Sequence, residues 1–145
     1  MMKSLRSLFT PKTPAELPMP AEVAVAALLV EAALVDGVYV NIESDMIAEI
    51  LLESFAFDAD KADAVLAQAE ALAEEAVGSH QFTKHAKKLS LADRVKVIEA
   101  IYLVVLADGE RSDEEEAYVR HVAGLLYVDD ISRAEARKRA EARSA

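Results

Sequence analysis

The chain has 145 residues, a net charge of −10 and no cysteine. This length suffices for one domain that buries roughly two thirds of its unfolded surface, and the missing cysteines exclude disulfides and thiolate metal sites. The acidic balance argues against nucleic-acid binding, which needs a basic surface, and abundant Ala, Leu and Val predict an all-α protein.

The first twenty residues differ from the rest. They contain all four prolines, which predicts a non-helical tether over residues 1–20. Residues 1–9 are basic and apolar, but they are too short for a secretory signal and for more than weak contact with a membrane surface. No apolar run reaches the roughly 18 to 20 residues of a membrane-spanning helix. We therefore expect a cytoplasmic protein, with membrane association through residues 1–9 as the alternative.

Periodicity and capping residues predict seven helices after residue 20. The first and the fifth are the most apolar and are expected to be central. Ser90 and Ser112 are each followed by an acid three residues later, which predicts helix starts at both positions. In chain order the predicted helices cover about residues 21–35, 42–55, 58–77, 81–88, 91–107, 112–126 and 131–143, and the last of these is charged on nearly every face.

One pattern occurs twice, 72 residues apart. Residues 32–43 read AALVDGVYVNIE and residues 104–115 read VVLADGERSDEE. In each copy an apolar run ends in Asp-Gly, and a Glu follows the glycine by six positions. This predicts an internal helix–Asp-Gly turn–helix duplication within one domain over residues 21–145. The two halves cover about 21–56 and 91–127, with linker helices over 58–88.

The repeat places two carboxylates at equivalent points of each copy: Asp36 and Glu43, then Asp108 and Glu115. An Asp at a helix C-terminus opposes the helix dipole, and a cation would relieve that cost. Oxygen ligands of this kind suit Ca²⁺, Mg²⁺ or Mn²⁺, so the four residues form a candidate metal site. Turn and cap formation explain the same residues without any ligand, and both interpretations stay open.

The chain offers no catalytic motif. Its three histidines lack the spacing of helical metal enzymes, and neither a nucleophile elbow nor a glycine-rich phosphate loop is present. The Asp-Gly…Glu spacing matches only part of a calcium-binding EF-hand loop, because apolar residues occupy its first and third positions. We therefore predict that the protein is not an enzyme. A metal-dependent hydrolase would need all four carboxylates in one open cleft.

These same residues carry a resemblance to a known family. Residues 32–37 with Glu43, and residues 106–109 with Glu115, resemble the TerB tellurite-resistance family over about residues 21–140. His80-Gln81-Phe82-Thr83 and Arg94 resemble a bacterial subgroup of it. The resemblance implies an all-helical fold of about seven helices, an acidic cluster for cation binding, and a role in tellurite and wider stress resistance without established enzymatic activity.

A second role follows from the same resemblance. A related domain occurs in membrane-anchored J-domain co-chaperones, which implies the alternative of a helical adaptor with an unidentified protein partner. The two copies also differ, because Val40 and Asn41 stand where the second copy has Ser112 and Asp113. We therefore expect the two half-sites to differ in geometry and affinity.

Overall fold

The structure is a computed structural model that describes residues 19–35, 41–107 and 112–144, the side chains of residues 41 and 42 excepted. Within these residues all regular structure is helical, which confirms the prediction of an all-α fold. Each predicted helix is present, with bounds within two residues of those expected. The helices are α2 (Ala21–Leu34), α3 (Asn41–Phe55), α4 (Ala59–Glu75), α5 (His80–Ala86), α6 (Leu91–Val105), α7 (Asp113–Leu125) and α8 (Asp130–Ser144).

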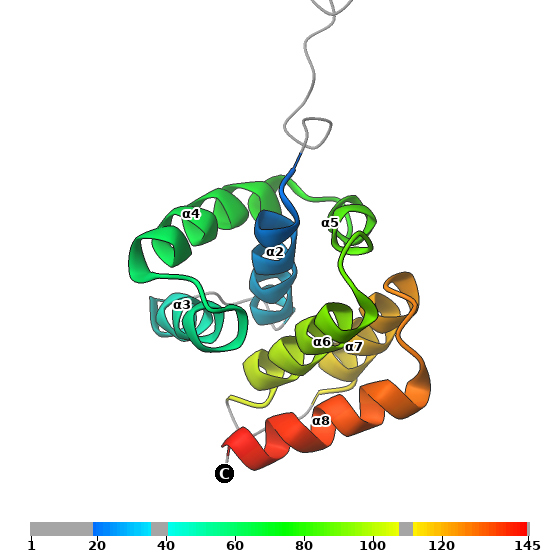
Figure 1. Cartoon of the computed structure of the whole chain (residues 1–145). Helices are drawn as coiled ribbons and strands as arrows, with labels where there is room; N and C mark the ends of the chain where they lie inside the picture. Colours follow the sequence, from blue (N-terminus) through cyan, green and yellow to red (C-terminus); the bar gives the residue numbers. More distant parts are fainter. Residues whose placement is uncertain (1–18, 36–40, 108–111, 145) are drawn as a thin grey trace, which may run out of the picture.

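Helix α2 lies at the centre of the described part of the molecule (Figure 1). It contacts α3, α4, α5, α6 and α7, and nearly all of its residues are buried. Fully buried alanines such as Ala24 and Ala27 let neighbouring helices approach its backbone closely, while Leu28 and Leu29 fill the core between them. Helix α6 contacts α2, α3, α7 and α8. Both helices expected to be central are therefore central.

Side-chain caps fix where four of the described helices begin, including α8, where the Asp129 carboxylate accepts a hydrogen bond from the Ser132 amide at 2.7 Å. Asp58 accepts a hydrogen bond from the Lys61 amide (2.7 Å) at α4, and Ser90 accepts one from the Asp93 amide at α6. Ser112 does the same for α7, accepting from the Glu115 amide at 3.0 Å. These caps confirm the helix starts predicted at Ser90 and Ser112, because each serine satisfies an amide that the helix itself leaves without a partner.

The charged helix α8 lies along α6 (Figure 1). Only Ala136 and Ala140 of α8 are buried, so the contact is a narrow stripe of small residues. Arginines on both sides of this stripe pair with Glu116 of α7 and with Glu99 of α6. The helix is therefore attached to the body mainly through polar contacts.

Each half of the predicted duplication contains one pair of consecutive helices: α2 and α3 in the first half, α6 and α7 in the second. The Asp-Gly turns that join each pair lie outside the described residues, so the duplication, its boundaries and the tether over residues 1–20 stay predictions. Among the described residues no helix is long and apolar enough to cross a lipid bilayer.

Candidate functional site

Two of the four predicted metal ligands lie in the part of the chain that the structure describes. Glu43 stands in the first turn of α3 and Glu115 in the first turn of α7, where the helix dipole favours a carboxylate. Asp36 and Asp108 lie outside the described residues. The sequence left open whether the two acidic pairs come together, and both aspartates of these pairs lie in the undescribed segments.

Both glutamates are withdrawn from water. The side chain of Glu115 is only 8% exposed, and its Oε1 accepts a hydrogen bond from the Ser112 hydroxyl at 3.0 Å. Glu43 is partly buried, and its Oε2 atom is buried from solvent. A carboxylate that leaves water pays a desolvation cost, which nearby donors or a cation can offset. Within residues 19–35, 41–107 and 112–144, no three acidic or histidine side chains are grouped to hold a metal ion.

A polar cluster at the centre of the fold was not predicted. Glu31 of α2 accepts hydrogen bonds at Oε1 from the Ser79 hydroxyl (2.9 Å) and from the Tyr118 hydroxyl (3.2 Å). The Tyr118 hydroxyl is also 2.8 Å from the Leu28 carbonyl oxygen. This Glu31 cluster ties α2, the start of α5 and α7 together. The signal that could have revealed it is a single acid inside an otherwise apolar helix.

Burial perturbs both acids of this cluster. It raises the pKa of Glu31, and hydrogen bonds from Ser79 and Tyr118 and the charge of His121 only partly oppose that shift. Burial also raises the pKa of Tyr118 well above its usual range, and the neighbouring Glu31 adds to the effect. The Glu31 cluster therefore favours an uncharged Tyr118 and a Glu31 carboxyl whose pKa is higher than usual.

The residues that resemble the bacterial subgroup have structural roles. Phe82 and Thr83 are fully buried in α5. Arg94 donates hydrogen bonds from Nη1 to the Leu126 carbonyl (2.6 Å) and from Nε to the Leu89 carbonyl (3.2 Å). Because Leu126 ends α7, Arg94 supplies a partner for a carbonyl that the helix leaves unsatisfied.

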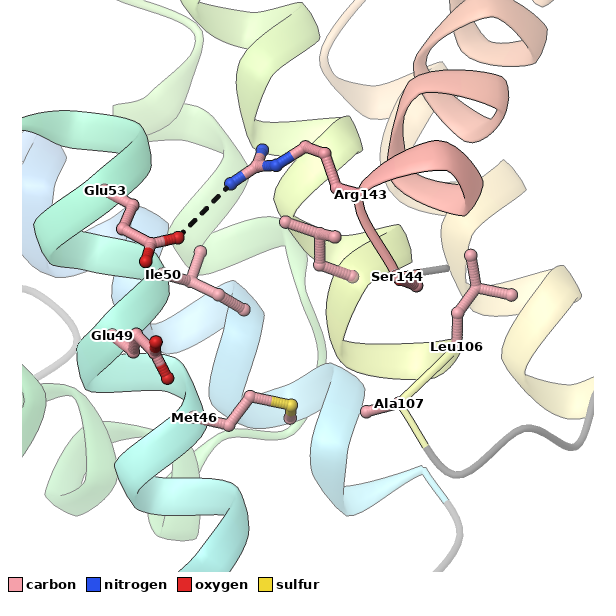
Figure 2. A pocket seen from close by; sticks show the side chains of 9 residues that line it. Met46, Glu49, Ile50, Glu53, Leu106, Ala107, Arg143 and Ser144 are labelled. Atoms are coloured by element: carbon pink, nitrogen blue, oxygen red, sulfur yellow. Dashed lines mark ion pairs between the residues drawn. The ribbon is translucent and has the colours of Figure 1, made fainter.

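A cavity of about 310 Å³ opens between α3 and the end of α6 (Figure 2). Met46, Ile50 and Leu103 contribute apolar surface to its walls. Figure 2 shows Glu49 and Glu53 on the α3 side, with Arg143 reaching across from α8 to pair with Glu53 at 3.8 Å. The cavity therefore combines an apolar surface with an acidic rim, which the sequence did not reveal.

The family model described as Tellurite resistance protein TerB matches residues 22–138. No curated protein and no solved structure matches the chain. The matched range runs from α2 through half of α8 and includes both Asp-Gly…Glu segments and the Glu31 cluster. Since it covers most of the 145 residues, it confirms the resemblance to the TerB family. The chain belongs to the TerB family of tellurite resistance proteins.

Proposed function

We propose that this TerB-family protein is a non-enzymatic, cytoplasmic protein of tellurite and stress resistance. It binds a divalent cation through Asp36, Glu43, Asp108 and Glu115. The observation that carries the proposal is that Glu43 and Glu115, each in the first turn of a helix and six residues after an Asp-Gly pair in the sequence, are both withdrawn from solvent. Family membership supports the resistance role, and the chemistry of the four acids supports the cation.

Negative charge at each acidic pair carries a free-energy cost that a cation can offset. Each acidic pair combines an Asp that the dipole of the preceding helix disfavours with a Glu that is partly desolvated. A divalent cation would offset both costs at once. Ligands that are all carboxylate oxygens select Ca²⁺, Mg²⁺ or Mn²⁺ over softer metals.

Thermal unfolding of chelator-treated protein, titrated with these three cations, tests the proposal. A ligand at about 100 times its dissociation constant stabilises the folded state by roughly 2.7 kcal/mol, which raises Tm by several degrees in a domain of this size. We expect a selective rise that Asp36→Asn/Asp108→Asn abolishes. The matched control, Asp60→Asn/Asp63→Asn, removes the same charge from exposed positions of α4 and should keep the rise. A flat response to all three ions would contradict cation binding.

A second candidate function is that of an adaptor, and exposed apolar side chains favour it. Tyr127 is 72% exposed and Ile131 is 74% exposed, four residues apart where α7 gives way to α8. If this corner recruits a protein partner, Ile131→Ser should keep Tm and lose both site-specific cross-links and tellurite resistance in cells. Unchanged cross-linking and resistance would count against the adaptor.

A further inference from the structure

The line along which α3 faces α6, here called the α3–α6 seam, is hollow at both ends. The cavity of about 310 Å³ described above contains Met46 and Leu106, from the start of α3 and just past the end of α6. A second cavity of about 200 Å³ contains Ser54 and Lys96, from the end of α3 and the first half of α6. The two helices therefore run in opposite directions, and the two cavities belong to one seam.

Arg143 of α8 crosses the seam between the two cavities. Its Nη1 lies 2.7 Å from Glu99 of α6, and its Nη2 donates to the Ser54 hydroxyl of α3 at 3.3 Å. It also pairs with Glu53 (Figure 2). Two glutamates thus neutralise Arg143, the one basic side chain among the described residues that line the larger cavity, and the rim retains the exposed carboxylate of Glu49.

The chemistry of the seam defines what fits it. The larger cavity offers apolar surface from Met46, Ile50 and Leu103, and the smaller one offers Phe55 and Phe57. Glu49 and Glu53 line the larger cavity, and Asp93 lines the smaller one beside Lys96, within a protein of net charge −10. A complementary ligand is a short segment that carries apolar side chains at helical spacing with basic residues between them.

We propose that residues 1–9 of this chain, MMKSLRSLF, dock in the α3–α6 seam. Met1, Leu5 and Leu8 follow the i, i+4, i+7 spacing with which a helix places apolar anchors in a groove. Lys3 and Arg6 stand between these anchors in the sequence and give the segment a positive charge, opposite in sign to the acidic side chains of the cavities. The segment therefore has the apolar pattern and the charge that the seam complements.

The intervening chain is long enough. Ala21, the first residue of α2, itself lines the smaller cavity. From Phe55 back to Met46 is a rise of about 14 Å along α3, at 1.5 Å per residue. A proline-containing segment as long as residues 10–20 reaches roughly 30 Å when it is extended, at about 3.1 Å per residue. Both cavities are within that reach, and a short tether of this kind holds its segment at an effective concentration of about 1 mM.

Spin labelling tests the proposal on the full chain, which has no cysteine and so accepts a single label at Ser4→Cys. Amide signals of Ile50, Ser54 and Leu103 should be broadened by the nitroxide, whereas those of Asp63 and Ala67 on the exposed side of α4 should not. Because the tether acts at about 1 mM, a free peptide of residues 1–9 should need a similar concentration to relieve half of the broadening.

Variants of the segment separate docking from chance proximity. Leu5→Asp/Leu8→Asp should remove the broadening at the seam, because a carboxylate replaces each apolar anchor. The matched control, Thr10→Asp/Thr13→Asp, adds the same charge to the tether. It should retain most of the broadening at the seam. Equal broadening of Ile50 and Asp63, or no difference between the two variants, would overturn the proposal.

Two further measurements identify other occupants. Broadening in a mixture of ¹⁵N-labelled chains and separate spin-labelled chains would show that the segment docks on a second copy. Co-sedimentation of the full chain with phosphatidylserine vesicles, lost in Leu5→Asp/Leu8→Asp, together with unbroadened seam signals, would show that the segment binds a membrane. Either result would overturn docking within one chain.

Discussion

Among the residues that the structure describes, two non-glycine residues adopt the left-handed backbone conformation, and each lies just past a helix end. Tyr127 (φ 55°) follows α7, where its own amide donates to the Gly124 carbonyl and the Val128 amide donates to the Ala123 carbonyl. This is the Schellman arrangement, in which glycine is usual. The ammonium of Lys87 lies 5.1 Å from the centre of the Tyr127 ring and offsets part of the strain. Ala56 (φ 57°) follows α3, and its side chain is a methyl group that has no ring for a cation to contact.

We predict that Ala56→Gly stabilises the protein. Glycine removes the clash between Cβ and the backbone at positive φ, which costs about 1 kcal/mol, and Ala56 is exposed, so no packing is lost. Thermal unfolding should show a Tm higher by roughly 2–4 °C. The same substitution at exposed Ala64 inside α4 should instead cost about 1 kcal/mol. A loss of stability in Ala56→Gly would contradict the strain argument.

At the scale of single helices, α8 shows how a charged element is held on the body. Its buried alanines contribute little apolar area, so its arginines carry much of the attachment. Glu99 of α6 is 14% exposed and accepts from Arg139 Nε at 2.5 Å and from Arg143 Nη1 at 2.7 Å. Glu116 of α7 is shared in the same way by Arg133 and Arg137.

We predict that Glu99→Gln loosens α8. Two charge-assisted hydrogen bonds become weaker, and because both arginines are partly exposed the expected cost is about 1–2 kcal/mol. Hydrogen exchange of the α8 amides should then be roughly tenfold faster, and the difference should shrink in 1 M NaCl, where charges are screened over about 3 Å. Glu135→Gln, which changes an exposed position of α8, should leave exchange unchanged. Equal exchange in both variants would mean that the alanine stripe alone holds α8.

At the scale of the whole molecule, the Glu31 cluster couples folding to pH. Burial raises the pKa of Glu31 in the folded state above its unfolded value, so the folded state binds this proton more tightly. The stabilisation from protonated Glu31 is therefore fully present below the unfolded pKa and is lost as pH rises through the raised folded pKa. Three helices meet at this carboxyl, so its ionisation affects the packing of α2 against both α5 and α7.

We predict that Glu31→Gln is more stable than the natural sequence at pH 7 and that the difference disappears towards pH 4. Glutamine keeps an acceptor for Ser79 and Tyr118 without the desolvated charge. Urea unfolding at several pH values measures the difference. Glu74→Gln, at an exposed position of α4, is the control and should show no comparable pH dependence. A Glu31→Gln protein that is less stable than the natural one at pH 7 would show that the hydrogen bonds outweigh the desolvation.

The sequence by itself determined the helices, their caps and the family. Periodicity and capping act over three or four residues, so the start of α7 at Ser112 could be predicted without any tertiary contact. The TerB resemblance rests on short segments of the same kind, and the family match over residues 22–138 confirmed it. Glu43 and Glu115 could be placed at helix starts for this reason, whereas metal binding by the four acids depends on distances that no local pattern fixes.

Only the tertiary structure decided which distant residues meet. Glu31 lies 48 residues from Ser79 and 87 from Tyr118, and Arg143 lies 89 from Ser54. The Glu31 cluster and the α3–α6 seam therefore have no local sequence signature beyond one acid in an apolar helix. The physical reason is that side-chain periodicity tells which face of a helix is buried, whereas the partner of that face depends on how the described helices pack together.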